Sequence, residues 1–461
     1  MRPIASLDAA RSPHIPLKTA ILGAGVSGLS LARFLVEGGV PLGELHLFEA
    51  AAEVGGLCRS KTVDGFTYDR AGGHILYSKD AAARDWMISC AGGPDAFVET
   101  ARQTRIRFGD CWVHYPFENG LCDLPAEVNK ECIEGYISAY EARSESGSEA
   151  PSDFDAWVRW RFGDGIHAHF MRPYNEKIWK RSLTELSSSW VAGRVPEAPL
   201  EDVVKASQGV RTEGYVHQSI FHYPETGGFQ AITDGIATAV MSQVRLNTPV
   251  TQLTRHGEGW RVDGEDFDLV ISTLPMDELP RIIEGVPAEV AAAMRELSYN
   301  SLSSILLAID SDEQPDFSWV YMPHDEQGPA NRVTYISNYS PGNAPAGGSG
   351  LQCEVNWRGD GQAPGEELTG EVIAGLERAG LLKKDQVLFS DRSDEGHAYI
   401  VYTHGFEERR RRSIDWLESV GVIPLGRFGR YDYHNSDQCV IAARELAAAL
   451  LERRSAGGQE A

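Results

Sequence analysis

The stretch TAILGAGVSGLSLARFLVEGGVPLGELHLFE, residues 19–49, decides the fold. Its apolar run Thr19–Gly23 predicts a strand, Val26–Val36 carries the apolar stripe of a helix, and Glu44–Phe48 predicts a second strand. A strand, a helix and a strand within about 30 residues form a unit whose two strands run parallel. The sequence therefore predicts an α/β fold built on a Rossmann-type domain.

The turn between the first strand and the helix matches the pattern GxGxxG, from Gly23 to Gly28, and Glu49 follows twenty-one residues later. Gly23 permits the tight turn, Gly25 lets the backbone approach a pyrophosphate, and Gly28 allows the helix to pack closely on the strand. The helix N-terminus offers free N–H groups and a positive dipole end to phosphates, and Glu49 can accept hydrogen bonds from ribose hydroxyls. This unit predicts a dinucleotide site.

Composition excludes several classes of protein. The 461 residues carry 43 Lys and Arg against 66 Asp and Glu, a net charge of -23, which argues against binding nucleic acid or an anionic membrane surface. No apolar run reaches the ~18 residues of a membrane span, and residues 1–18 have no stretch typical of a signal peptide and look like a flexible lead-in. The seven cysteines are scattered and never form CxxC, so we expect no disulfide framework, no metal site and a reducing cytoplasm.

The rest of the chain predicts a discontinuous organisation. We expect the Rossmann-type domain to comprise residues 18–80, 225–295 and 415–452, a helical insert 120–215, and a substrate domain with an antiparallel β-sheet 81–119 and 296–414. The polar stretch Ser144–Ser152 predicts an exposed loop. Further strands are expected over Val244–Leu253, Gly259–Val262, Phe267–Thr273, Leu302–Asp310, Ser318–Met322, Arg332–Ser337, Leu351–Trp357 and Val420–Leu425, and helices over Asp153–Trp179, Glu366–Ala379 and Ser436–Leu451.

A second glycine pair indicates which dinucleotide binds. The segment AAEVGGLCRS, residues 51–60, resembles the one that follows the first motif in the FAD family of amine oxidases, protoporphyrinogen oxidases and UDP-galactopyranose mutases. The resemblance implies FAD, with Arg59 on a phosphate and the C-terminal helix directing its positive end at the flavin pyrimidine, where reduced flavin carries negative charge. The cofactor-binding residues it implies are Gly23, Gly25, Gly28, Glu49, Gly56, Arg59, Gly73, Gly426, Asp437 and Gln438.

Five further blocks, in family order over most of the chain, resemble UDP-galactopyranose mutases, more the eukaryotic than the bacterial type. They are YDRAGGHILYS with Gly72-Gly73-His74, YPFEN at 115–119, FMRPYNEKIW at 170–179, RVTYISNYSPGN at 332–343, and GRFG at 426–429 with the tyrosines, Asn435, Asp437 and Gln438 that follow. The resemblance implies that His74 lies beside flavin N5 on a loop whose glycines permit movement. It also implies that the YPFEN segment contacts a nucleotide base and that Arg172 and Arg427 bind substrate phosphates.

The catalytic residues implied are therefore His74, Arg172 and Arg427, and we expect the two guanidinium groups to converge over the isoalloxazine. Arginine suits this task because its planar fork binds phosphate oxygens bidentately. The alternatives are ordinary salt bridges for the arginines, a hydrogen-bonded loop histidine, and aromatic residues that only pack in the core. The substrate-binding residues implied are Tyr115, Phe117, Glu118, Asn175, Tyr299, Tyr399 and Tyr433.

The reaction that the resemblance implies interconverts the pyranose and furanose forms of a nucleotide-diphosphate sugar without net redox change. In that reaction the reduced flavin N5 attacks the anomeric carbon and displaces the nucleotide. The protein then has to position the anomeric carbon and stabilise the leaving diphosphate. NAD(P)H is a candidate reductant, although the sequence holds no second dinucleotide motif.

Three positions depart from the family pattern. Glu118 stands where the family has Gln, and an ionised carboxylate only accepts hydrogen bonds, which suits the N1–H and N2–H of guanine better than uracil. The strand that ends at Asp310 lacks an expected arginine, so another residue has to supply that phosphate contact or it is missing. The segment Ala398–Tyr402 lacks a proline. These departures suggest a mutase-like enzyme whose sugar or nucleotide differs from the family standard.

Two other functions stay open. An oxidase of the amine-oxidase or protoporphyrinogen-oxidase type would transfer a hydride to oxidised flavin and need an apolar tunnel rather than two arginines. A non-catalytic nucleotide-binding or assembly protein would keep the scaffold and lose the chemistry. The sequence predicts neither the sugar nor the oligomeric state.

Overall fold

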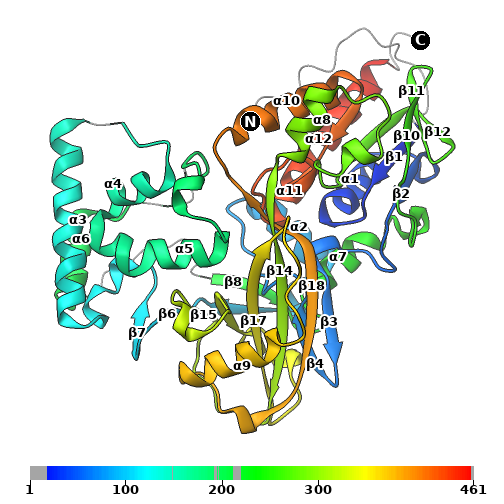
Figure 1. Cartoon of the computed structure of the whole chain (residues 1–461). Helices are drawn as coiled ribbons and strands as arrows, with labels where there is room; N and C mark the ends of the chain where they lie inside the picture. The colour runs from blue at the N-terminus through cyan, green and yellow to red at the C-terminus, as the bar shows by residue number, and fades with distance from the viewer. Residues whose placement is uncertain (1–17, 148, 192–194, 196, 211–219, 458–461) are drawn as a thin grey trace.

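The computed structural model describes residues 18–147, 149–191, 195, 197–210 and 220–457, so the lead-in expected over residues 1–17 lies outside the described residues. A five-stranded parallel sheet in the order β19-β13-β1-β2-β9 forms the Rossmann-like domain (Figure 1). Its strands are β1 (Thr19–Leu22), β2 (Leu45–Phe48), β9 (Val244–Arg245), β13 (Leu269–Ser272) and β19 (Val422–Pro424). The predicted fold class is confirmed.

Helix α1 (Val26–Glu37) follows β1 and covers the parallel sheet. Its buried stripe includes Leu29, Leu31 and Leu35, and it packs against α7 (Gln230–Ala237) and the C-terminal α12 (Ser436–Gly457). Figure 1 shows this meeting of the blue and red ends of the chain. The two ends of the sequence thus complete one domain.

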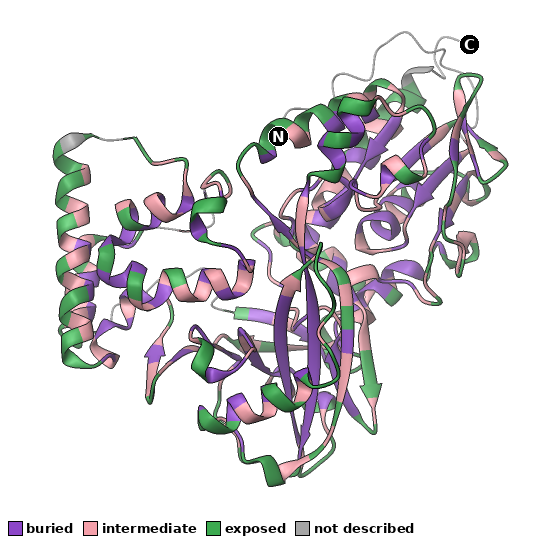
Figure 2. Cartoon of the chain, viewed as in Figure 1, coloured by how far each residue is buried: buried purple, intermediate pink, exposed green. Residues whose placement is uncertain are grey.

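A seven-stranded sheet forms the second layer, in the order β18-β14-β17-β16-β15-β6-β7. Neighbours run antiparallel except β15 and β6, which are parallel, so the expectation of an antiparallel sheet is wrong at that pair. Figure 2 shows β14 and β17 as almost continuously buried. The strands are β6 (Thr104–Phe108), β7 (Cys111–His114), β14 (Ser298–Ile309), β15 (Trp319–Tyr321), β16 (Arg332–Tyr335), β17 (Ser349–Arg358) and β18 (Val387–Val401).

Both faces of β14 are buried because its side chains alternate between two partners. Ile305 and Leu307 pack in the cluster that includes α9 (Leu368–Arg378), whereas Leu306 and Ala308 pack with Phe66 and Tyr68 of the hairpin. A strand buried on both faces reads as a continuous apolar run. This hairpin consists of β3 (Ser60–Val63) and β4 (Phe66–Asp69).

The helical insert stands beside the sheet (Figure 1), and five of its described helical segments are five residues or longer. They are α3 (Ala126–Ser146), α4 (Phe154–Ile166), the π-helix η6 (His167–Met171), α5 (Arg172–Trp179) and α6 (Leu200–Ser207). The end of α5 docks on the sheet because the Ile178 carbonyl accepts hydrogen bonds from the amides of Asn300 (2.9 Å) and Asn356 (3.0 Å). No helix within the described part of the chain is long and apolar enough to cross a membrane.

Three expectations need correction or comment. Helix α3 extends into the predicted Ser144–Ser152 loop and ends at Gly147, whose left-handed φ of 57° breaks the helix. The strand expected over Val244–Leu253 is two strands, because Asn247 adopts φ 52° and Pro249 follows. Helix α2 (Ala81–Cys90), expected in the substrate domain, packs on α7 and α12, while the predicted domain boundaries stay predictions.

The remaining elements connect these layers. Strand β5 (Phe97–Ala101) pairs with β8 (Ile220–Pro224), and β10 (Leu253–His256), β11 (Gly259–Val262) and β12 (Glu265–Phe267) form a small antiparallel sheet. The remaining α-helices are α8 (Ala288–Arg295), α10 (Phe406–Ser419) and α11 (Gly426–Gly429).

Candidate functional site

A cavity of about 740 Å³ lies between the parallel sheet and the seven-stranded sheet. It begins where β1 and β13 end, at Gly23 and Thr273, and extends to β18 and the start of α12. Ligands of open parallel sheets bind at this carboxyl edge. We call its two parts the dinucleotide end (Gly23, Gly25, Glu49, Gly56) and the cationic end (Arg332, Tyr399, Arg427, Tyr433).

Glycines keep the dinucleotide end open. Gly23 has φ 99°, and a Cβ there would lie 2.3 Å from Thr273 Oγ1. A Cβ on Gly25 would point at the Gly56 backbone, 3.7 Å from its Cα, and would fill the space into which a pyrophosphate fits. A Cβ on Gly28, which does not line the cavity, would lie 2.1 Å from the Gly23 carbonyl oxygen. The contacts of Gly23 and Gly28 fit the tight turn and the close helix packing expected from the sequence, and the role of Gly25 toward a pyrophosphate stays a prediction.

Glu49 lines the same end and is held by backbone groups. Its Oε2 accepts a hydrogen bond from the Ala24 N–H and its Oε1 from the Ala51 N–H, each at 2.9 Å. A carboxylate oxygen has two lone pairs, so both oxygens retain one for the hydroxyls of a ribose. The position and chemistry of Glu49 therefore fit an adenosine ribose.

The start of α12 forms another wall. Asn435, Ser436 and Cys439 line the cavity, so the positive end of the helix faces it. Gly426 also lines it, with φ 82°, and a Cβ there would lie 2.4 Å from Ser27 Oγ. Asp437 and Gln438 do not line it. Burial raises the pKa of Asp437, and Gln438 Oε1 accepts the Asn435 N–H at 3.0 Å, so their cofactor role stays a prediction.

Arg59 borders the cavity but is partly engaged. Its Nε donates to the Gly56 carbonyl at 2.8 Å, and its Nη2 lies 3.3 Å from the Glu395 carboxylate. Glu395 also pairs with Arg70 at 3.2 Å. An arginine held on a carboxylate can still contact a phosphate with its other N–H groups, as predicted for Arg59.

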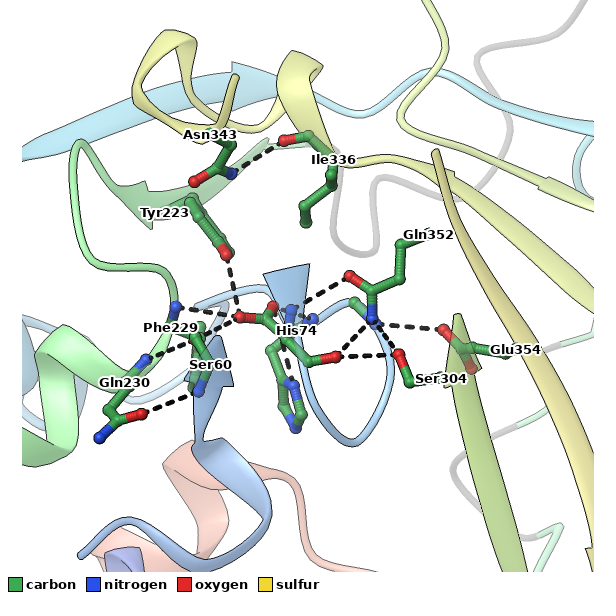
Figure 3. A network of polar contacts seen from close by, with 12 residues as sticks. Ser60, His74, Tyr223, Phe229, Gln230, Ser304, Ile336, Asn343, Gln352 and Glu354 are labelled. Carbon is green, nitrogen blue, oxygen red and sulfur yellow. Dashed lines mark hydrogen bonds and ion pairs between the residues drawn. The ribbon is translucent and has the colours of Figure 1, made fainter. Parts of the chain in front are cut away.

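His74 belongs to a network centred on the buried Asp69 carboxylate. Asp69 Oδ1 accepts hydrogen bonds from Ser60 Oγ (2.7 Å), Tyr223 Oη (2.9 Å) and the Phe229 N–H (3.1 Å), while Oδ2 accepts the His74 N–H at 2.9 Å (Figure 3). The His74 ring stacks on Phe229, and its Nδ1 is buried without a hydrogen-bond partner. Burial lowers the pKa of His74 more than Asp69 raises it, so the ring is neutral at pH 7.

Glu354 fixes the loop before His74 and was missed from the sequence. This carboxylate is 1% exposed, accepts the Gly73 N–H at 3.1 Å and accepts Arg332 Nε at 2.7 Å. A Cβ on Gly72, which has φ 88°, would lie 2.8 Å from its Cδ. Glu354 thereby joins the histidine loop to Arg332.

Arg332 is the second functional residue that the sequence analysis missed. It lines the cavity near Tyr399, whose hydroxyl lies 3.4 Å from Glu354. Arg332 supplies a positive charge to the cavity. The end of the strand at Asp310, where the family pattern has an arginine, is exposed and supplies none. The signal that could have found it is the RVTYISNYSPGN block, which begins with this arginine.

Arg427 carries a charge that no described carboxylate offsets. Its guanidinium donates to the carbonyls of His434 (2.9 Å) and Ala398 (3.2 Å), and its Nε is buried without a hydrogen-bond partner. The rings of Tyr433 and Tyr399 lie 4.4 Å and 5.6 Å from it. The ordinary salt bridge considered for Arg427 is therefore absent among the described residues, and the arrangement suits an anionic ligand.

Arg172 does not converge with Arg427 in this structure. It is exposed at the start of α5, lies outside the cavity lining, and forms no ion pair with a described residue. The expected meeting of the two guanidinium groups is thus wrong for this arrangement of the insert. The role of Arg172 as a phosphate ligand stays a prediction.

The other substrate residues divide between the cavity and its surroundings. Tyr399 and Tyr433 line it, and Tyr115, 40% exposed, contacts the cavity-lining Tyr321 ring at 5.3 Å. The remaining four lie outside its lining, as Tyr115 does, and the substrate roles of all seven residues stay predictions. Phe117 stacks on Phe170 at 4.7 Å, Asn175 bonds Met171 and Trp179, Tyr299 stacks on His397, and Glu118 is buried with a pKa raised to about 7 by that burial.

Comparison with known proteins places the chain. The sequence profile of flavin-containing amine oxidoreductases matches residues 152–394, and that of an NAD(P)-binding Rossmann-like domain matches residues 21–87. The chain belongs to the flavin-containing amine oxidoreductase family. It is therefore a flavoenzyme, and the glycines and Glu49 of the dinucleotide end are the residues that would hold FAD.

Individual relatives include both a mutase and oxidases. A crystal structure of reduced UDP-galactopyranose mutase is similar with a TM-score of 0.87 and 26% identity, covering 96% of this chain and 98% of that one, which confirms the predicted resemblance. A putative protoporphyrinogen oxidase from Exiguobacterium sp. 255-15 has a TM-score of 0.71 and 18% identity, covering 94% and 98%. Coproporphyrinogen III oxidase of Mycobacterium tuberculosis is 24% identical over 345 residues, 70% of this chain and 73% of that protein.

Proposed function

We propose that the protein is a flavin-dependent mutase that interconverts the pyranose and furanose forms of a nucleotide-diphosphate sugar. The observation that carries the proposal is the cationic end of the cavity. It holds Arg427 without a described carboxylate partner, together with Arg332 and the phenols of Tyr399 and Tyr433, and it continues directly from the dinucleotide end. The likeness to the reduced mutase over 96% of the chain supports it.

When bound, reduced FAD supplies the nucleophile for the anomeric carbon. Arg427 stabilises the diphosphate as its bond to that carbon breaks and negative charge builds on the leaving oxygen. Arg332 keeps N–H donors beyond those used on Glu354 and can contribute them to a phosphate oxygen. The hydroxyls of Tyr399 and Tyr433 can donate hydrogen bonds to the diphosphate. Tyr115, beside Tyr321, provides an aromatic surface for the nucleotide base.

Neutral His74 contributes a hydrogen bond rather than a charge. Its Nδ1 is buried without a hydrogen-bond partner, and a neutral imidazole has one N–H that can donate to a ligand oxygen. The hydrogen bonds that Asp69 accepts from the His74 N–H and Glu354 accepts from the Gly73 N–H hold this loop against the sheet. His74 can therefore orient a carbonyl or hydroxyl oxygen in the cavity.

The nucleotide base is the open part of the substrate. If Glu118 reaches the base as a carboxylate, it accepts from guanine N–H groups, whereas as a neutral acid it also donates to uracil. Titration of the FAD-loaded protein with UDP, GDP and CDP at pH 8 separates these cases. Tighter GDP binding is expected, and tight UDP binding would remove the hypothesis.

An oxidase is the second candidate, because curated relatives at 24% identity are coproporphyrinogen III oxidases. Such an enzyme would bind its substrate in an apolar tunnel and pass electrons from that substrate through FAD to oxygen. The mutase needs FAD reduced beforehand, for which NAD(P)H is a candidate donor. The redox requirement therefore distinguishes the two.

The test measures both reactions on one preparation. The enzyme is reduced without oxygen, and UDP-galactose and other nucleotide sugars are followed by NMR for conversion between ring forms. In parallel, the oxidised enzyme receives coproporphyrinogen or an amine in air, and peroxide is measured. The proposal expects ring interconversion that stops when the flavin is oxidised, and no peroxide. Peroxide with no interconversion would establish the oxidase.

A further inference from the structure

A second histidine, His397, lies on the wall of the cavity. It belongs to β18, two residues before Tyr399, and both residues line the cavity. The carbonyl of Ala398, between them, accepts the hydrogen bond from Arg427 Nη2 at 3.2 Å. His397 therefore lies beside the cationic end of the cavity.

A buried carboxylate orients the His397 ring. Asp277 is 9% exposed, and its two oxygens lie 3.0 Å and 3.2 Å from His397 Nε2. Asp277 Oδ1 also accepts the Tyr431 hydroxyl at 2.7 Å, from a tyrosine that is fully buried and has φ 49°. The three residues come from the loop after β13, from β18 and from the loop before α12.

The rings around His397 leave its second nitrogen available. Tyr299 stacks on it with centroids 3.9 Å apart, and Phe428 meets it edge-on at 5.3 Å. Glu278 lies close to this pair, since one carboxylate oxygen each of Asp277 and Glu278 and a ring nitrogen of His397 lie within 4.8 Å of one another. The Nδ1 atom of His397 has no hydrogen-bond partner among the described residues. Because it is also not one of the fully buried atoms that lack a partner, part of its surface is accessible.

This arrangement is the one that general acid–base catalysis uses. A carboxylate that accepts one ring N–H fixes the imidazole orientation and stabilises its protonated form, and the other nitrogen exchanges a proton with the substrate. We infer that His397 is a proton-transfer residue of the cavity, positioned by Asp277 and Tyr431. The inference rests on the proposed mutase function.

The proposed reaction needs such a group twice. When the sugar ring opens, the bond between the anomeric carbon and the ring oxygen breaks, its electron pair stays on the oxygen, and that oxygen takes a proton from Nδ1 of the His397 imidazolium. When the ring closes, a hydroxyl oxygen bonds the anomeric carbon and its proton returns to Nδ1. FAD, when bound in its reduced form, would supply the electron pair that stabilises the anomeric carbon between the two steps. The sugar is isomerised, and the histidine ends as it began.

The experiment compares His397→Gln and Asp277→Asn with His167→Gln. His167 is a matched control because it is 1% exposed and pairs with Asp155 at 2.6 Å in the helical insert, outside the cavity lining. For each FAD-loaded variant, kcat for ring interconversion is measured from pH 5 to 9, with flavin content and Tm. His397→Gln is expected to lower kcat by about 100-fold and to remove one ionisation from the pH profile. Asp277→Asn should lower kcat less and displace that ionisation, and the control should leave the profile unchanged.

A second readout does not need turnover. Diethyl pyrocarbonate modifies accessible neutral imidazoles, and mass spectrometry of the wild-type protein locates the modified residues with and without UDP or GDP. Modification of His397 that UDP or GDP prevents supports the inference. A His397→Gln enzyme with a wild-type pH profile and kcat within about threefold overturns it. If the wild type isomerises nothing at any pH, the proposed function fails separately, and a His397 left unprotected by every ligand then overturns the inference as well.

Discussion

The two ends of the cavity are built in different ways. At the dinucleotide end, Gly23, Gly25 and Glu49 lie within residues 19–49, and backbone conformation and backbone hydrogen bonds shape the site. At the cationic end, Arg332, Tyr399 and Arg427 come from β16, β18 and α11, which only the completed fold brings together. We propose that the first end holds the FAD cofactor and that the second sets the substrate.

The difference shows which part of the function each end determines. Family membership rests on the profile match over residues 152–394, and the dinucleotide end lies in the separate Rossmann-like match over residues 21–87, so neither match distinguishes a mutase from an oxidase. The reaction depends on what the cationic end binds. Substitutions at the two ends should therefore separate cofactor loss from loss of turnover.

The largest effect is expected from Gly25→Val. A branched side chain would occupy the space between Gly25 and Gly56 that the pyrophosphate needs, so the variant should purify without flavin colour. The ratio of absorbance at the flavin and protein bands measures this. Gly43→Val is the control, because a Cβ placed on Gly43 would have no heavy atom within 4 Å outside its chain neighbours. A yellow Gly25→Val protein would contradict the assignment of the dinucleotide end.

Arg427→Ala should affect the opposite end alone. Removing a donor that strengthens as the diphosphate leaves should lower turnover by about 100-fold, with FAD content unchanged. Steady-state kinetics of ring interconversion provides the measurement, and Arg411→Ala on the exposed surface of α10 serves as the control. Unchanged turnover would show that the cationic end does not hold the leaving group.

Arg172→Ala tests whether the helical insert contributes to the cationic end when a ligand binds. Loss of one charge-assisted contact to a phosphate should raise KM by about 10-fold. The Tm should stay unchanged, since Arg172 is exposed and has no ion pair with a described residue. An unaltered KM would leave Arg332 and Arg427 as the phosphate ligands.

The smallest effect concerns stability. Burial raises the pKa of Glu118 from 4.5 to about 7 in the folded protein, so the folded state binds an extra proton between these pH values and loses stability as pH rises through them. Glu118→Gln removes that penalty and should raise Tm by a few degrees at pH 8 but not at pH 4. Calorimetry at both pH values measures the shift, with the exposed Glu134→Gln as control. An equal shift of Tm at both pH values would contradict the assignment of the raised pKa to burial of the Glu118 carboxyl.

The two ends also differ in how well the sequence predicts them. Gly23, Gly25 and Glu49 were predictable because the constraint on each is local and has one residue type as its solution. Arg427, Tyr399 and Tyr433 were found through resemblance, and the structure places them in the cavity. Arg332, Glu354 and His397 were not assigned, since each acquires its role from partners 22 to 281 residues away in sequence. Arg172 was placed in the cavity because a motif fixes its helix but not the position of that helix relative to the sheet.

The central claim is that the cationic end holds the diphosphate of a sugar whose anomeric carbon reacts with the reduced cofactor. The most direct measurement reduces the enzyme, adds a nucleotide sugar, treats the mixture with cyanoborohydride and weighs the released flavin. The account predicts flavin that carries the mass of the sugar in the wild-type protein and far less of it in Arg427→Ala. Flavin of unaltered mass in the wild type, with peroxide formed from a porphyrinogen or an amine, would contradict it.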